Sequence, residues 1–292
     1  MQNLKYYFKK AQKERWAVPQ FNFSDYTQLK GIANKCSQMR SPFILGTSEG
    51  ESGFFGLQEA VALRNTLRNK LHTPIFLNLD HGKSFDYIKT AIDAGYDMVH
   101  FDGSKLPVEE NIKITRQIKK YAKQKQGLFS GRNVLVEGEM GKIGTDSSKV
   151  YEGKFEIKEE DLTLPGDAQK FVEETRVDLL AVSIGNFHGI ESSGINPALR
   201  IDVLKSINEA TGTILVLHGG SGIPENNIKE AIKFGIVKIN INTELRLAFS
   251  NKLRSELSTD EIVPYKYLAE PQKEVEKIVE AKINLFGSAN RV

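Results

Sequence analysis

The segment FLNLDHG, residues 76–82, places a mostly apolar run directly before an acid, an imidazole and a glycine. The apolar run has the composition of a buried β-strand, so Asp80 and His81 fall where that strand ends. Two titratable groups at one strand end raise the question of whether other strands of this chain end in the same way.

Short apolar or β-branched runs recur along the chain, and a longer amphipathic stretch follows each of them. We predict strands at 17–22, 42–47, 74–79, 97–102, 134–139, 178–184, 213–218 and 236–241. Eight strand–helix units in 292 residues predict an α/β fold of the (β/α)8, or TIM-barrel, type. The alternative is a doubly wound sheet, which usually has fewer units and a GxGxxG first turn; no such turn follows the first strand here.

Three of the connecting helices have recognisable ends. A helix over 24–39 is predicted to begin with Ser24 as its N-cap. A helix over 223–234 has Pro224 near its first turn and a glycine after its last residue, and a terminal helix is predicted over 266–285 with a proline early in it.

The composition is that of an ordinary globular protein, with 40% hydrophobic and 26% charged residues. A net charge of +3 does not build the basic field that nucleic-acid binding needs. The single cysteine, Cys36, cannot form an intramolecular disulfide, which fits a reducing compartment. The charged N-terminus lacks a signal-peptide core, and no run approaches the ~18 apolar residues of a membrane span. We expect a soluble, cytoplasmic protein that binds neither nucleic acid nor membrane.

No linker or compositional break divides the chain, so residues 1–292 are predicted to form one domain. The one irregular segment is 140–165, which is polar, contains glycine and is long for a loop between a strand and a helix. We expect it to be a mobile active-site loop or lid.

Three of the five histidines follow predicted strands, and a glycine comes after each: His81, His188 and His218. Catalytic groups of a TIM barrel come from the C-terminal ends of its strands, so these imidazoles would meet at one mouth, as in a three-ligand Zn²⁺ site. The alternative, three unrelated polar histidines, does not account for their shared position. His72 lies in a turn and is expected at the surface, and His100 lies inside a strand and is expected to pack within the barrel.

Three acids, Asp80, Asp102 and Glu139, also fall at predicted strand ends. Asp80 could transfer protons at the substrate or orient the imidazole of His81 through a hydrogen bond. Asp102 and Glu139 could hold a second cation, order the histidines, or only cap a helix.

Two turns have the composition of phosphate sites. LHGGSGIP (217–224) precedes a helix, so the backbone N–H groups of Gly219, Gly220 and Ser221 could face an anion. NINTE (240–244) follows the last strand in the same way. Phosphate sites after strands seven and eight are usual in this fold, and the pair of turns therefore indicates a phosphorylated substrate.

Seven motifs resemble those of the zinc-dependent class II fructose-bisphosphate aldolases: LDHG, FDGSKLPVEEN, VEGEMG, IGNFHG, LVLHGGSGIP, KININTE and INLFGSANRV. The resemblance runs from AVPQFN to the C-terminus, and HGGSGIP with NINTE is closer to the fructose- than to the tagatose-bisphosphate branch. It implies reversible retro-aldol cleavage of fructose 1,6-bisphosphate to dihydroxyacetone phosphate and glyceraldehyde 3-phosphate.

The resemblance also implies roles for individual residues. His81, His188 and His218 would bind a catalytic Zn²⁺ that polarises the ketone and stabilises the enediolate, although Co²⁺ or Fe²⁺ would also suit such ligands. Asp80 would take the proton from the C4 hydroxyl and return it during condensation. Asp102 and Glu139 would support the metal ligands or hold a second divalent cation. The loops from Gly189 to Ser221 hold a monovalent cation in relatives.

Arg246 matches a C6-phosphate contact that reaches a neighbouring subunit. Relatives are usually dimers or larger, which implies a homodimer or homotetramer. The substrate- and phosphate-binding candidates are Asn22, Ser48, Gly189, Gly219, Gly220, Ser221, Asn240, Asn242, Thr243 and Arg246.

The chain departs from the family pattern in three places. In GTDSS, Ser147 stands where the family has the glutamate that handles the proton at the enediolate carbon, and Asp146 or Glu152 could substitute for it. HGIESSG offers Glu191 where a phosphate-binding lysine is usual, and VPYKYL has Tyr265 in place of an arginine at the second phosphate.

These departures leave two alternatives to fructose 1,6-bisphosphate cleavage. One is a family member that acts on another ketose phosphate, such as tagatose 1,6-bisphosphate or a monophosphate. The other is a metal-binding paralogue with little aldolase activity. Losing one charge-assisted phosphate contact costs ~1.5–3 kcal/mol, and losing a general acid or base costs ~10²–10⁴ in rate. Lys142, Lys149 and Lys154 could restore positive charge, although lysines in such a segment are more often solvated surface.

Overall fold

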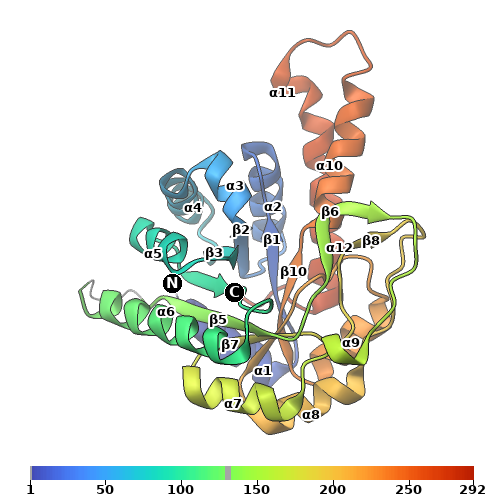
Figure 1. Ribbon diagram of the computed structural model, residues 1–292. Helices are drawn as coiled ribbons and strands as arrows, with labels where there is room; N and C mark the ends of the chain where they lie inside the picture. Colours follow the sequence, from blue (N-terminus) through green and yellow to red (C-terminus); the bar gives the residue numbers. More distant parts are fainter. Residues whose placement is uncertain (1, 129–132) are drawn as a thin grey trace.

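The computed structural model describes residues 2–128 and 133–292. Its central strands are β1 (Val18–Asn22), β2 (Phe43–Thr47), β3 (Ile75–Gly82), β4 (Met98–Phe101), β5 (Leu135–Met140), β7 (Leu179–Val182), β9 (Ile214–Leu217) and β10 (Ile236–Ile241). They close into a parallel barrel in the order β1-β10-β9-β7-β5-β4-β3-β2 (Figure 1). All eight correspond to predicted strands, and the TIM-barrel prediction is confirmed.

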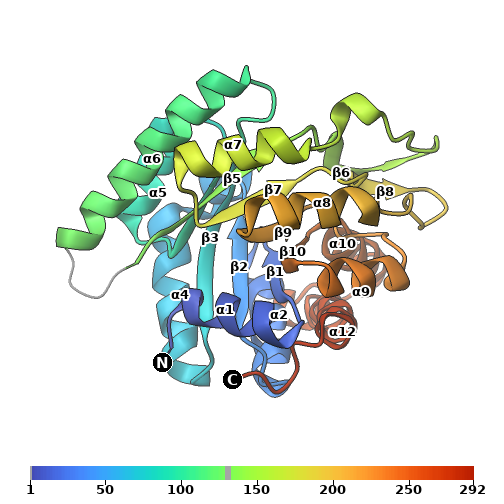
Figure 2. The ribbon, with the colours of Figure 1, turned by 90° about the horizontal axis from the view of Figure 1, so that it is seen from below.

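Helices surround the barrel (Figure 2). They are α2 (Tyr26–Gln38), α3 (Glu49–Phe55), α4 (Leu57–Leu71), α5 (Phe85–Ala94), α6 (Val108–Leu128), α7 (Pro165–Thr175), α8 (Ile201–Thr211), α9 (Glu225–Lys233), α10 (Thr243–Glu256), α11 (Pro264–Tyr267) and α12 (Ala269–Phe286). Among the described residues, no helix combines the length and apolar character needed to cross a membrane.

Two predicted helix boundaries need correction. The N-cap of α2 is Asp25 rather than Ser24, because the Asp25 carboxylate accepts hydrogen bonds from the backbone N–H groups of Thr27 and Gln28, at 2.5 and 3.0 Å. The terminal helix predicted over 266–285 is two helices, the short α11 and the long α12. The helix predicted over 223–234 is α9, with Pro224 as its N-cap.

A helix that the sequence reading missed, α1 (Leu4–Glu14), lies across the barrel strands in Figure 2. Its buried face, which includes Tyr7 and Phe8, packs against residues at the beginnings of strands, among them Phe76 and Met98. This apolar cluster closes the N-terminal end of the barrel and leaves the C-terminal end for the polar groups.

The predicted 140–165 loop contains regular structure. It includes β6 (Thr145–Tyr151) and a short 3-10 helix, η1 (Glu159–Asp161). β6 pairs in parallel with β8 (His188–Glu191) in a separate two-stranded sheet. The segment is therefore anchored beside the His188 end of the site, and its mobility remains a prediction.

The helices α10, α11 and α12 form a hairpin that extends beyond the barrel (Figure 1). Its outer part exposes the apolar side chains of Leu257, Ile262 and Tyr265. The lower part of the hairpin is tied to the barrel through α12, whose Val275, Val279 and Ile283 are buried.

Candidate active site

The adjacent residues Asp80 and His81 reach the same centre because β3 is irregular at its end. In a regular strand their side chains would point to opposite faces. The register between β3 and β4 shifts between Leu79 and Gly82, and His81 has a left-handed backbone with φ +55°. Ligand atoms of both residues consequently lie within 4.8 Å of one another and of His218.

Each of two imidazoles is held by a carboxylate through one ring nitrogen. His81 Nδ1 lies 3.2 Å from Asp102 Oδ2, and His218 Nε2 lies 2.6 Å from Glu137 Oε1. The remaining nitrogens, His81 Nε2 and His218 Nδ1, approach to 2.9 Å. Carboxylates placed in this way fix the ring orientation of metal-binding histidines. These two nitrogens, which are within hydrogen-bond distance of each other, therefore face one point, as ligands of a common ion would.

The third predicted ligand, His188, begins β8 and lies near the same centre. Its ring centroid is 4.7 Å from that of His81 and 6.1 Å from that of His218. The structure thus brings together all three predicted imidazoles, although the ligand atoms that lie within 4.8 Å of one another around His218 are those of Asp80, His81, His100 and His218, without His188.

His100 belongs to the centre more closely than the sequence suggested. It is fully buried in β4, as predicted, but its ring centroid lies 4.7 Å from His81 and 4.6 Å from His218. Its Nδ1 accepts a hydrogen bond from the backbone N–H of His81 at 3.1 Å. His72, by contrast, is exposed, as predicted.

The donor set suits a divalent cation. Asp102 and Glu139 form a second group with His81, in which the ligand atoms again lie within 4.8 Å of one another. His100 Nε2 and Glu139 Oε2 are buried 3.2 Å apart, yet neither has a hydrogen-bond partner among the described residues. Buried polar atoms without partners are costly, and a cation bound near them would offset part of that cost.

The charges of the site are strongly coupled. Burial alone would raise the pKa of Asp80, but His81, His218 and Lys238 hold it well below its usual range. Burial acts to lower the pKa of His81, but Asp80 and the hydrogen bond to Asp102 outweigh it and raise the pKa to about 9. A bound cation would compete with that proton, because metals bind the neutral imidazole.

The other three imidazoles titrate at lower pH. Burial lowers the pKa of His100 to about 4 and that of His188 to about 3, and it lowers the pKa of His218 well below its usual range. These rings are neutral at pH 7, which is the form that binds a metal.

A small pocket of about 50 Å³ opens beside this centre. Its lining residues are Asn22, Ser48, Asp80, His81, Ser147, His188, Gly219, Ser221, Asn240, Asn242 and Thr243. All but Ser147 were predicted as site residues. The predicted residues outside this lining are Gly189, Gly220, Arg246, His218, Asp102 and Glu139.

The turn at 217–224, one of the two phosphate-type turns (217–224 and 240–244), needs glycine at position 219. The φ of Gly219 is +61°, and an added Cβ would lie 2.1 Å from the backbone oxygen of Phe187, directly before His188. The turn thus packs against the segment that carries the third imidazole. Gly189, at φ +93°, is similarly close to the backbone of β6, with Lys149 O at 2.8 Å from an added Cβ.

Besides Glu137 beside His218, the structure reveals a second acid that the sequence reading missed, Glu51 in α3. It is 5% exposed and forms a capping box with Ser48. Its Oε2 accepts a hydrogen bond from Asn22 Nδ2 at 3.1 Å, and the same amide donates to Asp80 Oδ2 at 2.9 Å. Its Oε1 lies 2.6 Å from Arg246 Nη2. The Ser-x-x-Glu spacing was a visible capping signal, but spacing does not reveal the contact with Arg246.

Neither acid considered as a substitute for the missing loop glutamate lines the pocket. Asp146 is exposed, and its Oδ1 accepts hydrogen bonds from both the backbone and the hydroxyl of Ser148, at 2.8 Å. Glu152 is also exposed. Ser147 lies between them in β6, and its carbonyl accepts a hydrogen bond from Thr243 Oγ1 at 2.9 Å.

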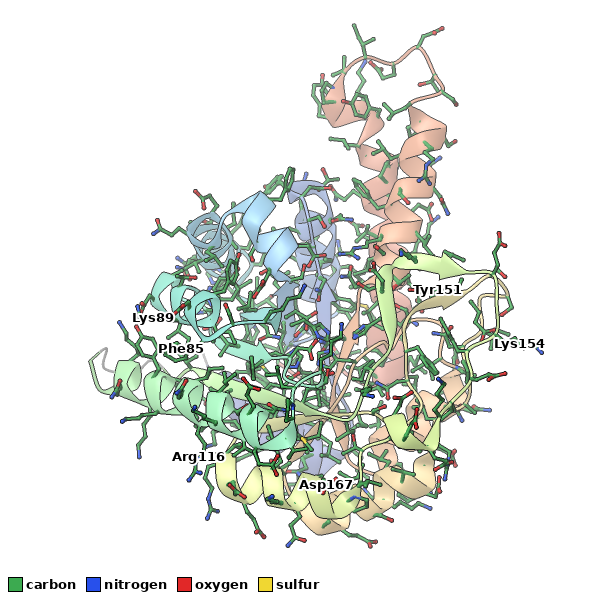
Figure 3. All side chains as sticks on the ribbon, viewed as in Figure 1. Phe85, Lys89, Arg116, Tyr151, Lys154 and Asp167 are labelled. Atoms are coloured by element: carbon green, nitrogen blue, oxygen red, sulfur yellow. The ribbon has the colours of Figure 1, made fainter. Side chains whose placement is uncertain are left out.

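The other departures do not bring positive charge to the pocket. Glu191 is buried and accepts a hydrogen bond from the backbone N–H of Phe155 at 2.8 Å, so it anchors the segment after β6. Tyr265 is 77% exposed on the hairpin. Lys142 and Lys149 are exposed, and Lys154 extends away from the barrel into solvent (Figure 3).

Comparison with known proteins agrees with this geometry. The family model described as fructose-bisphosphate aldolase class-II matches residues 2–291. A fructose-bisphosphate aldolase of Staphylococcus epidermidis is 35% identical over 286 residues, covering 96% of this chain and 95% of the relative. A 6-phospho-5-dehydro-2-deoxy-D-gluconate aldolase of Shouchella clausii is 37% identical, covering 96% of this chain and 92% of the relative. The crystal structure of the YdjI aldolase of Escherichia coli matches with a TM-score of 0.82 at 29% identity, covering 100% of this chain and 99% of the other.

Proposed function

Because this chain belongs to the class-II fructose-bisphosphate aldolase family, we propose that it reversibly cleaves a ketose 1-phosphate to dihydroxyacetone phosphate and an aldehyde. It is an aldolase, a carbon–carbon lyase of the metal-dependent class. The observation that carries the proposal is the approach of His81 Nε2 and His218 Nδ1 to each other beside the Asp80 carboxylate, at the edge of a polar pocket.

We propose His81, His188 and His218 as ligands of Zn²⁺ or another divalent cation, with His100, Asp102 and Glu139 as supporting groups or ligands of a second cation. A divalent ion held there would polarise the ketone carbonyl and stabilise the negative charge that develops as the carbon–carbon bond breaks. The neutral rings of His188 and His218 and the carboxylates behind His81 and His218 support this assignment.

Asp80 is suited to act as the general base. Two amides orient its carboxylate: Asn22 Nδ2 donates to Oδ2 at 2.9 Å and Asn240 Nδ2 donates to Oδ1 at 3.0 Å. The carboxylate would take the proton of the C4 hydroxyl while the C3–C4 bond breaks and its electron pair stays with the dihydroxyacetone phosphate half. In the condensation direction the same group returns the proton to the new alkoxide.

The 1-phosphate fits the turns that precede α9 and α10. Gly219 and Ser221 line the pocket from the first turn, and Asn242 and Thr243 line it from the second. Thr243 is the first residue of α10, and the dipole at this N-terminus favours an anion. A monovalent cation beside the Gly189–Ser221 loops is part of the same proposal and rests on the family resemblance alone.

Two substrate classes remain, which differ in whether the aldehyde half carries a phosphate. The name of the Staphylococcus epidermidis relative and the presence of Arg246 favour fructose 1,6-bisphosphate, with tagatose 1,6-bisphosphate as its epimer. The pairing of Arg246 with Glu51 favours a substrate whose only phosphate is on the dihydroxyacetone half.

We further propose a cytoplasmic homodimer or homotetramer. The exposed apolar side chains of Leu257, Ile262 and Tyr265, which all lie on the projecting hairpin, support an assembly.

The decisive experiment measures release of dihydroxyacetone phosphate by the Zn²⁺-loaded protein from fructose 1,6-bisphosphate, tagatose 1,6-bisphosphate and fructose 1-phosphate. We expect turnover of at least one, loss of turnover in EDTA, and recovery when Zn²⁺, Co²⁺ or Fe²⁺ is returned. Asp80→Ala should lower kcat by roughly 10²–10⁴-fold, while Asp86→Ala, which removes an exposed acid of α5, should not. Stoichiometric zinc binding without turnover of any ketose phosphate would instead identify a non-catalytic paralogue.

A further inference from the structure

Glu51 is a buried acid at the edge of the pocket, and its carboxylate is fully occupied by hydrogen bonds. Oε2 accepts from the backbone N–H of Ser48 at 2.8 Å and from Asn22 Nδ2 at 3.1 Å. Oε1 accepts from Arg246 Nη2 at 2.6 Å and from Asn242 Nδ2 at 3.2 Å. Three of these partners, Asn22, Ser48 and Asn242, line the pocket themselves.

Both terminal nitrogens of Arg246 are also occupied by hydrogen bonds within this network. Its Nη2 is paired with Glu51, and its Nη1 donates a hydrogen bond to Ser147 Oγ at 3.1 Å. Ser147 is the pocket residue that stands where the family pattern has an acid. The guanidinium thus joins α10, α3 and β6 at the edge of the pocket, beside the turn that precedes α10.

The charges in this region cancel. Arg246 contributes one positive charge and Glu51 one negative charge, and no lysine or arginine is among the described residues that line the pocket. A phosphate group carries about −1.5 to −2 charges at pH 7. A second phosphate placed against Arg246 would find the positive charge of that side chain already balanced by Glu51.

We propose that Glu51 sets the substrate specificity of this aldolase by neutralising Arg246, so that the preferred aldehyde half carries hydroxyl groups and no phosphate. The inference rests on the proposed aldolase function and narrows its substrate class. The Ser147 hydroxyl offers a hydrogen-bonding group at the pocket wall, which suits a hydroxylated chain.

Arg246 could bind a phosphate only by leaving Glu51. That exchange would leave a carboxylate that is 5% exposed without its cation, and an uncompensated buried charge is strongly unfavourable. Glu51 therefore acts as a positioning residue: it opposes the phosphorylated aldehyde through Arg246 without touching the reacting atoms.

The test uses the condensation direction, in which dihydroxyacetone phosphate is the common donor. kcat/KM is measured for glyceraldehyde and for glyceraldehyde 3-phosphate with the Zn²⁺-loaded wild-type protein and with Glu51→Gln. Glutamine retains the capping box with Ser48 but frees the charge of Arg246. Glu49→Gln is the matched control, since it removes a charge from the same helical turn and contacts the backbone of Lys83 instead.

Wild type should prefer glyceraldehyde, and Glu51→Gln should shift the preference toward glyceraldehyde 3-phosphate by roughly ten- to a hundredfold, mainly through KM. Glu49→Gln should leave the preference unchanged, and Arg246→Gln added to Glu51→Gln should reverse the gain. A wild-type preference for glyceraldehyde 3-phosphate, or a preference that Glu51→Gln does not move, would overturn the inference and leave the aldolase assignment intact. No consumption of dihydroxyacetone phosphate with either aldehyde would overturn the proposed function itself. Thermal unfolding of each variant shows whether the fold is retained.

Discussion

At the scale of single residues, the inner wall of the barrel holds an ion pair that supports the site from below. Lys238 Nζ and Glu137 Oε2 lie 2.8 Å apart, and both side chains are fully buried. The other oxygen of Glu137 orients His218. The three groups form a chain in which the cation balances the acid and the acid fixes the imidazole.

We expect Lys238→Met to lower the free energy of unfolding by about 3–5 kcal/mol, because it leaves the Glu137 carboxylate buried without its cation. Adding Glu137→Gln should recover part of the loss, since the stranded charge is then removed as well. Urea denaturation of the metal-free single and double variants measures both effects. If the single and the double variant lose the same free energy of unfolding, the buried charge of Glu137 is not the cause of the loss.

Residues also show where the sequence was insufficient. His81, His188 and His218 could be predicted as one group because each follows a strand and precedes a glycine. His100 could not, because a histidine inside a strand can face either the core or the barrel mouth. Glu51 could not either, because its partner Arg246 is far away in the chain. Local sequence patterns predict where strands end, but pairs of residues that are distant in the chain are recognised only in the folded barrel.

At the scale of elements, the barrel strands and α1 were predictable, but the strand pair outside the barrel was not. Each barrel strand is a short apolar run, which is a strong local signal. The signal for α1 was also local, because Leu4, Tyr7, Phe8 and Ala11 repeat at helical spacing after an Asn N-cap, although the sequence analysis missed it. β6 was missed because its sequence, TDSSKVY, is polar, and its pairing with β8 depends on contacts between separate loops.

Gly219 and Gly212 have similar backbone angles, so comparing them separates the cost of a left-handed backbone from the cost of a steric clash. Gly219 has φ +61° and Gly212 has φ +57°, but an added Cβ meets Phe187 O at 2.1 Å only at Gly219; at Gly212 it meets nothing within 4 Å. Gly212→Ala should therefore cost about 1–2 kcal/mol from the left-handed backbone alone. Gly219→Ala should cost more and should also raise KM, because it displaces the segment that leads to His188.

Chemical denaturation and steady-state kinetics on the two alanine variants measure this difference. Gly212→Ala, which lies in the loop after α8, is the control for backbone strain. Equal stability and equal KM in the two variants would mean that the turn at Gly219 tolerates a shift of its neighbours, contrary to this account.

At the scale of the whole molecule, the two ends of the barrel differ in character: one is apolar and packed, and the other carries the polar site. The apolar cluster under α1 closes one end, and the histidines, acids and phosphate-type turns occupy the other. The hairpin of α10 and α12 links the site to the molecular surface, since α10 carries Thr243 and Arg246 at its first turn and ends among exposed apolar residues. A contact made at the hairpin tip is thus connected through one helix to the pocket.

This arrangement predicts that the hairpin mediates assembly. Leu257 is 56% exposed and Ile262 is 86% exposed, and no part of the described chain covers them. In an assembly with two-fold symmetry the same patch serves both subunits, so a change at either residue counts twice. Leu257→Asp combined with Ile262→Asp should reduce the mass in solution to that of a monomer, as measured by size-exclusion chromatography with light scattering. Ile195→Asp, at a 62% exposed residue outside the hairpin, should leave the mass unchanged. A monomeric wild-type protein would contradict the proposed assembly. An oligomer that survives the double substitution would show that the subunit contact lies outside the hairpin.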